Sequence, residues 1–268
     1  MSIDFVSFFG NASSAVQIVV LSVGVYRAFE IRRGFADATY RARALASTVF
    51  MVFVIITNVT FLIPLPNSPL GAVIGFVPFL ALILASFALV DSNVLAATRS
   101  DFFHRSIIHW QNLRLSAGVV LVGSGFLIST AIASDPQAFA SVPQGSDPLW
   151  VLISYYQFFV VAAAVIGYGA LGLIVGSRRT PDRTLKRHIR LLGFALAMFV
   201  LSILFYSVGS YDATQIAGNL LTLIATYFLY LSVMSLTPLG HRLKEVVAVS
   251  PLLVDQGIPG PDMNRGQK

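Results

Sequence analysis

Residues 149–175 read LWVLISYYQFFVVAAAVIGYGALGLIV, and residues 176–190 continue with GSRRTPDRTLKRHIR. The first stretch contains no Asp, Glu, Lys or Arg, whereas the second contains six Lys or Arg residues. An apolar run of this length is long enough for a helix to cross the roughly 30 Å hydrocarbon core of a bilayer. The basic loop directly after it indicates which end of that helix faces the cytoplasm.

Six further apolar segments of similar length lie before and after this one. Inside a bilayer each must be helical, because a helix satisfies all its backbone hydrogen bonds within one segment. The 268-residue chain is 56% hydrophobic and 11% charged, whereas a soluble domain carries about a quarter charged residues. The sequence therefore predicts an all-α integral membrane protein, a seven-transmembrane-helix bundle with spans at 5–26, 44–63, 70–97, 115–133, 149–175, 191–208 and 214–236.

The basic residues alternate completely along the chain. All 18 Lys and Arg residues fall in 27–43, 99–114, 178–190 and the tail after Pro238, and the connecting segments on the other side contain none. This pattern follows the positive-inside rule, so we expect a multi-pass protein of the cell membrane with its N-terminus outside and its C-terminus cytoplasmic. The net charge of +6 is explained by the placement of basic residues on one side of the membrane. We therefore expect the lipid bilayer as a partner and do not expect nucleic acid.

The sequence divides into three parts. Residues 1–238 form the predicted transmembrane domain. Apolar residues recur at helical spacing within 239–249, which predicts a short amphipathic helix on the inner leaflet. Residues 250–268 are rich in Pro and Gly, which predicts a flexible cytoplasmic tail.

Several kinds of chemistry lack the residues they need. The chain has no Cys, which excludes disulfides and thiolate chemistry. A conventional retinal Schiff base requires a lysine inside the bundle, whereas the lysines fall in predicted cytoplasmic segments: Lys186, Lys244 and Lys268. The four histidines fall in such segments as well: His104, His109, His188 and His241. We therefore expect no cofactor, no metal, no catalytic residue and no enzymatic activity.

Polar uncharged residues follow one face of the seventh span, at steps of three or four residues, and others lie at comparable depth in four further spans. In lipid such groups must face protein or water. Two interpretations stay open: interhelical hydrogen bonds that hold the bundle, or a ligand cavity that opens outward. The candidate residues are Gln17, Asn58, Gln157, Tyr206, Gln215, Asn219, Thr222 and Thr226.

Asp91 lies near the inner end of the third span. A carboxylate at that depth is costly unless it is paired, so a basic partner is expected. Arg27, Arg43 or Arg99 could supply it, and Arg99 lies eight residues further along the same chain. We predict an inner-face ion pair between Asp91 and Arg99, which is either static or a lock that opens on signalling.

Two features predict local packing. Gly172 and Gly176 form a G-x-x-x-G pair, which indicates close helix approach within the bundle or across a homodimer. Pro78 interrupts the third span and predicts a kink there.

The basic, leucine-rich stretch LKRHIRLL at 185–192 leads from the last inner loop into the sixth span. In this stretch and in helix number the chain loosely resembles the heptahelical sensing regions of prokaryotic sensor kinases. The resemblance implies a receptor or sensor, which here would signal through a separate cytoplasmic or membrane partner because no kinase segment follows. Two alternatives stay open: an accessory subunit of a membrane complex, and a small-molecule transporter of 3+1+3 repeat type, suggested by the similar runs 37–41 and 182–186.

Overall fold

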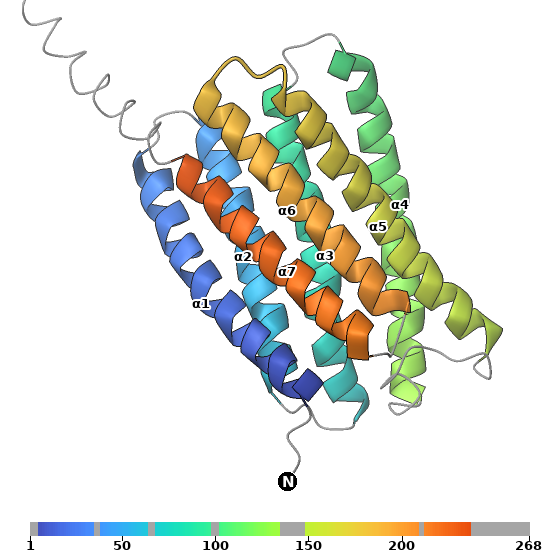
Figure 1. Ribbon diagram of the computed structural model, residues 1–268. Coiled ribbons are helices and arrows are strands. Elements are labelled where there is room, and N and C mark those ends of the chain that lie inside the picture. Colours follow the sequence, from blue (N-terminus) through green and yellow to red (C-terminus); the bar gives the residue numbers. More distant parts are fainter. Residues whose placement is uncertain are drawn as a thin grey trace, which may run out of the picture.

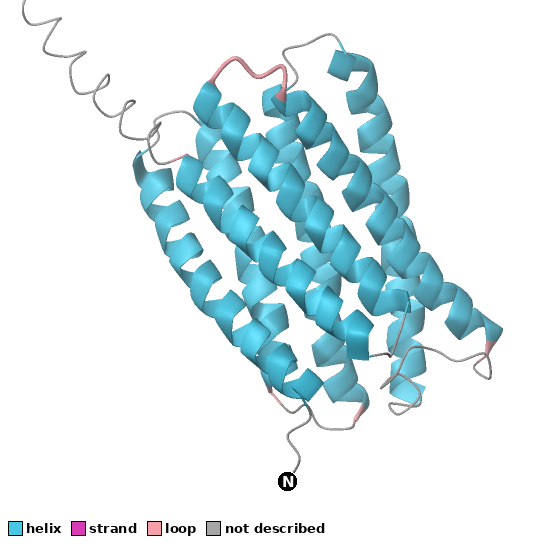
Figure 2. Ribbon diagram, viewed as in Figure 1, coloured by secondary structure: helices cyan, strands magenta, loops and turns pink. Residues whose placement is uncertain are grey.

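The computed structural model describes residues 5–34, 38–63, 68–97, 102–134, 148–208 and 212–236. These residues form seven helices (Figures 1 and 2): α1 (Phe5–Gly34), α2 (Ala38–Leu62), α3 (Pro69–Ala97), α4 (Phe102–Ser134), α5 (Leu149–Ser177), α6 (Arg183–Val208) and α7 (Asp212–Ser235). The predicted amphipathic helix at 239–249 and the tail at 250–268 lie outside the described residues.

All seven of these helices are long and apolar enough to cross a membrane. The helix content and the number of candidate spans confirm the prediction of an all-helical, seven-span, multi-pass membrane protein. The orientation of the chain across the membrane stays a prediction.

Several helices begin earlier than hydropathy predicted. The sixth span was expected at 191–208, whereas α6 begins at Arg183. Asp182 explains this start, because its Oδ1 accepts the backbone N–H groups of Thr184 at 2.7 Å and Leu185 at 3.0 Å. These two N–H groups would otherwise lack partners at the helix N-terminus. Hydropathy marks only the part of a helix that lies in hydrocarbon, and the backbone hydrogen bonds continue beyond it.

The helices form a closed ring. Each helix packs on the next one in the chain, α7 returns to α1, and α3 also contacts α5. The C-terminus of α1, the N-terminus of α2 and the loop between α5 and α6 lie at one end of the bundle (Figure 1). We refer to it as the basic end, because it carries Arg33, Arg43, Arg178 and Arg183. The opposite end carries the N-termini of α1, α3, α5 and α7.

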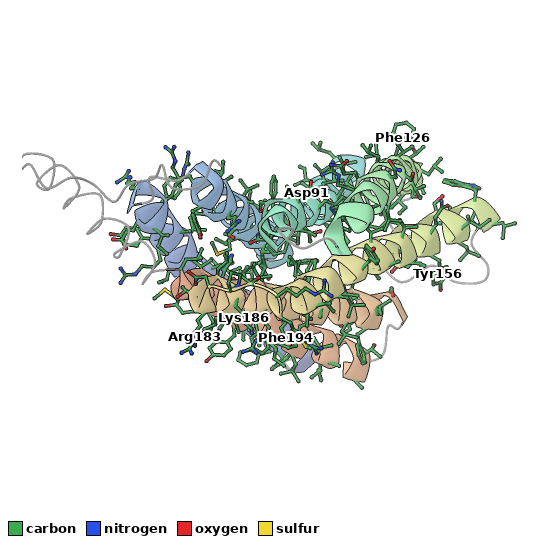
Figure 3. The ribbon with its side chains drawn as sticks, turned by 90° about the horizontal axis from the view of Figure 1, so that it is seen from above. Asp91, Phe126, Tyr156, Arg183, Lys186 and Phe194 are labelled. Atoms are coloured by element: carbon green, nitrogen blue, oxygen red, sulfur yellow. The ribbon has the colours of Figure 1, made fainter. Side chains whose placement is uncertain are left out.

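Aromatic side chains fill the interior and also cover the exterior. Phe158 of α5 is fully buried, and its ring lies 5.3 Å from that of Phe76 and 6.2 Å from that of Phe79, both on α3. Phe126, by contrast, is 71% exposed on the outward side of α4 (Figure 3). An apolar exterior around an apolar core is the pattern of a protein whose solvent is hydrocarbon.

The closest approach of α5 and α6 depends on a glycine that the sequence analysis did not single out. A Cβ atom added at Gly193 of α6 would lie 2.7 Å from Ile174 Cγ1 and 3.0 Å from the Ala170 carbonyl oxygen of α5. At Gly172, half of the predicted G-x-x-x-G pair, an added Cβ would meet nothing within 4 Å. Gly172 therefore makes no close contact within the bundle. Pro78 lies inside α3, which continues through it.

We expect Gly193→Ala to lower the apparent stability of the detergent-purified protein by about 1–3 kcal/mol, because the backbone of α5 must move to accommodate the methyl group. Gly172→Ala is the matched control, since both substitutions raise helix propensity equally and the second meets open space. Thermal unfolding compares the two variants. Equal melting temperatures would show that α5 and α6 do not approach as closely as described.

Candidate functional site

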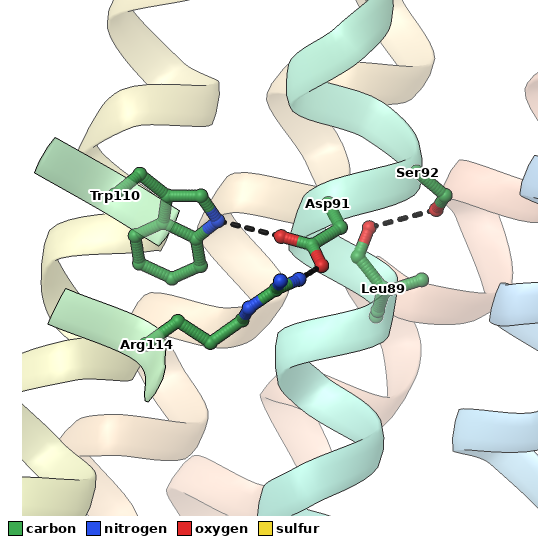
Figure 4. Close-up of polar contacts among 5 residues, drawn as sticks. All are labelled: Leu89, Asp91, Ser92, Trp110 and Arg114. Carbon is green, nitrogen blue, oxygen red and sulfur yellow. Dashed lines mark hydrogen bonds and ion pairs between the residues drawn. The ribbon is translucent and has the colours of Figure 1, made fainter. Parts of the chain in front are cut away.

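Asp91 of α3 is held by two side chains of α4. The indole Nε1 of Trp110 donates to Oδ1 of Asp91 at 2.6 Å, and the guanidinium of Arg114 pairs with Oδ2 (Figure 4). Trp110 and Arg114 are four residues apart, so they project from one face of α4 toward the same carboxylate. Both carboxylate oxygens are therefore occupied by donors.

Aromatic packing positions the Trp110 indole. The ring stacks on Tyr168 of α5 with centroids 6.0 Å apart and meets Phe87 of α3 edge-on at 6.5 Å. Gly169 allows this approach, since a Cβ there would lie 3.1 Å from the indole. The charged side chains remain partly accessible, at 31% for Arg114 and 26% for Asp91. The cluster of Asp91, Trp110 and Arg114 thus joins α3 to α4, packs on α5 through Tyr168, and keeps one edge open.

Among the described residues, the basic partner of Asp91 is therefore Arg114, whereas the expected pair with Arg99 stays a prediction. Arg27 pairs with Glu30 of its own helix at 2.7 Å, and Arg43 donates from Nε to the carbonyl oxygen of Ser92 at 3.2 Å. Arg99 lies outside the described residues.

The sequence analysis missed Arg114 because it assigned this residue to the loop before the fourth span. A depth comparison could have found it. Asp91 precedes the end of its candidate span, Phe76–Asn93, by two residues, and Arg114 follows the start of the next, Trp110–Ala131, by four residues. Consecutive spans run antiparallel, so these two positions lie at similar depth.

The polar face of α7 forms hydrogen bonds at four successive levels. At the level farthest from the basic end of the bundle, the Tyr206 hydroxyl of α6 donates to Oδ1 of Asn219 at 2.8 Å. One turn further, the hydroxyls of Ser202 and Thr222 lie 2.6 Å apart. Thr222 donates its own proton to the Gly218 carbonyl at 2.8 Å, so Ser202 is the donor between the two hydroxyls. Both levels join α7 to α6.

At the third level the hydrogen bonds connect α7 with α1 and α2. Oε1 of Gln17 accepts from Nδ2 of Asn58 at 3.2 Å and, in a longer contact of 3.5 Å, from the Thr226 hydroxyl. Nε2 of Gln17 donates to Ser13 at 3.1 Å. All four side chains are buried. The polar residues predicted on the first, second and seventh spans thus form one network between three helices.

The fourth level involves a histidine. His188 of α6 is fully buried, with Nδ1 2.8 Å from the carbonyl oxygen of Ser232 on α7. A carbonyl oxygen only accepts, so Nδ1 carries the proton, and the Ser232 hydroxyl donates to the His188 carbonyl at 3.3 Å. The sequence analysis placed His188 in a cytoplasmic segment. The structure shows that His188 is helical and buried between α6 and α7, because α6 begins at Arg183; on which side of the membrane it lies stays a prediction.

Two predicted members do not join these contacts. Gln157 is exposed on α5, which packs on α3, α4 and α6, so the structure does not bring it to the others. Gln215 is half-buried one turn before Asn219 on α7. A small cavity of about 20 Å³ lies between α2, α6 and α7, lined by Thr222, Thr226 and apolar side chains. That volume has room for one water molecule.

No protein-family model, curated protein or solved structure matches this chain. Among the described residues, no three His, Asp or Glu side chains gather closely enough to hold a metal ion. The candidate site is therefore defined by its own geometry: the hydrogen-bonded face of α7 and the ion-paired cluster between α3 and α4.

We expect Asp91→Asn and Arg114→Gln each to destabilise the protein by about 2–3 kcal/mol, because each leaves one charge without its partner. The double variant should cost less than the sum, with a coupling energy of about 1–3 kcal/mol. Thermal or denaturant unfolding of all four proteins measures this cycle. The exposed pair Arg27–Glu30 is the control and should couple much more weakly, because solvent screens it. Additive effects at Asp91 and Arg114 would contradict the pairing.

A second prediction concerns the buried amide network. Gln17→Met removes three side-chain contacts at nearly constant volume, and membrane hydrogen bonds average about 0.6 kcal/mol each. We expect a loss of about 1–2 kcal/mol in unfolding experiments. Gln157→Met, on the exposed face of α5, is the matched control and should change stability little. A similar loss in both variants would contradict the network.

Proposed function

We propose that this protein is a heptahelical sensor in which α7 transmits a signal along the bundle to a separate partner. The observation that carries the proposal is the series of polar contacts from Asn219 to Ser232, which spans most of the length of α7. These contacts involve α6 at three levels and α1 with α2 at the remaining one. A shift of α7 therefore exchanges hydrogen-bond partners on both of its sides.

The strength of these contacts suits a switch. Four levels at an average of about 0.6 kcal/mol sum to about 2–3 kcal/mol. Conformations that differ by a few kcal/mol leave the minor state populated at about 0.1–10%, and a ligand that prefers it can shift the balance. The small cavity beside Thr222 and Thr226 leaves space next to the moving helix.

The two ends of α7 suit input and output. The bond between Tyr206 and Asn219 is exposed, so a polar ligand can compete for either group. With the orientation that the charge alternation predicts, this end faces outside and the other faces the cytoplasm. The cluster of Asp91, Trp110 and Arg114 holds α3 and α4 together, which would provide a fixed frame for a shift of α7.

Loss of the contact between Tyr206 and Asn219 should shift α7 in the same way as a bound ligand would, but without the ligand. Because the chain has no Cys, Val175→Cys on α5 and Tyr227→Cys on α7 introduce two unique, lipid-exposed labelling sites. We expect Asn219→Ala to change the spin-label distance distribution between them in nanodiscs, measured by pulsed electron paramagnetic resonance.

Gln157→Ala is the control for this experiment and should leave the distribution unchanged. An identical distribution in Asn219→Ala and the parent would contradict a mobile α7. That outcome would favour a static role such as a subunit of a membrane complex.

A further inference from the structure

A cleft opens between the first turns of α6 and the last turns of α7. It has a volume of about 330 Å³ and is lined by Arg183, Thr184, Arg187, Leu231, Met234 and Ser235. The two helices contain candidate spans at Arg183–Ser207 and Asp212–Ser235, so the cleft lies where both spans end. Lipid headgroups occupy this level of a membrane. Figure 3 shows Arg183 on the outward side of α6.

The two arginines lie on one face of α6. Arg183 and Arg187 are four residues apart, and both are exposed. Within the described part of the chain, the ion pairs are Arg27–Glu30 and Arg114–Asp91, so neither cleft arginine has a carboxylate partner there. Two neighbouring guanidinium groups repel each other, and an anion between them would remove that repulsion.

The other groups of the cleft have distinct roles. Asp182 accepts the backbone N–H groups of Thr184 and Leu185, so two donors of the helix N-terminus are already used and recognition depends on side chains. The Ser235 hydroxyl donates to the Ser232 carbonyl at 2.6 Å, which leaves only its oxygen available. Thr184 is the hydroxyl that remains to donate. Leu231 and Met234 form an apolar wall on the α7 side.

We infer that this cleft binds the phosphate group of an anionic phospholipid in the leaflet at the basic end. Guanidinium groups bind phosphate oxygens through paired, charge-assisted hydrogen bonds. The apolar wall offers contact to the start of an acyl chain, which a free phosphate ion would not use. Basic pockets between helices at the membrane surface recognise lipid headgroups in this way.

The test uses the full-length protein in detergent and native mass spectrometry with added lipid. We expect dioleoyl phosphatidylglycerol to bind at least about tenfold more tightly than dioleoyl phosphatidylcholine, because the charge-assisted bonds require a net negative headgroup. Arg183→Gln/Arg187→Gln should abolish this preference. Arg33→Gln/Arg178→Gln, which removes the same charge from the same end of the bundle, should retain it.

Three further arms keep the result interpretable. The melting temperature of each variant without added lipid reports on folding. Arg183→Lys/Arg187→Lys should keep part of the preference for phosphatidylglycerol, because lysine retains the charge but lacks the planar pair of donors. Inorganic phosphate should not displace the lipid. Displacement by phosphate, equal binding of both lipids, or equal loss in the control variant would each overturn the assignment.

Discussion

Hydrocarbon offers no hydrogen-bonding partner, so polar side chains within the bundle depend on the protein for theirs. Among the described residues a few buried atoms, such as Nε2 of His188, have none. This constraint explains most of the specific contacts. Asp91 uses both oxygens, on Trp110 and Arg114. The Gln17 side chain uses its carbonyl and its amide nitrogen on three neighbours. His188 directs Nδ1 to a backbone carbonyl of α7. Because an unsatisfied group costs several kcal/mol in lipid, these pairs also determine how the helices are rotated about their axes.

The ring is held together differently on its two sides. Between α3, α4 and α5 the contacts include an ion pair and an aromatic stack. Around α7 the contacts are hydroxyl and amide hydrogen bonds. The proposal of a mobile α7 rests on these hydrogen bonds. Gly218 of α7 also brings this helix close to α6, since a Cβ atom there would lie 2.9 Å from the Tyr206 ring.

The lipid inference adds a second place where a molecule from outside the protein would meet α7. The exposed bond of Asn219 lies near one end of this helix, and Ser235 lies at the other, in the wall of the cleft. If a headgroup occupies the cleft, the position of α7 relative to α6 depends on the surrounding leaflet as well as on hydrogen bonds inside the bundle. A single helix would then couple conditions on the two faces of the membrane.

The amino-acid sequence determined the number of helices, their approximate positions and the polar face of α7, because bilayer thickness imposes a length and the helical repeat imposes a spacing that a linear pattern records. It also identified Asp91 as a residue that needs a cation. Only the tertiary structure decided which cation, since Arg114, Arg43 and Arg27 are equally basic and differ only in where their helices bring them. It likewise buried His188, separated Gln157 from the other polar residues and placed Gly193 rather than Gly172 at a close helix contact. These outcomes depend on how helices distant in sequence are rotated against one another, and no local pattern encodes that rotation.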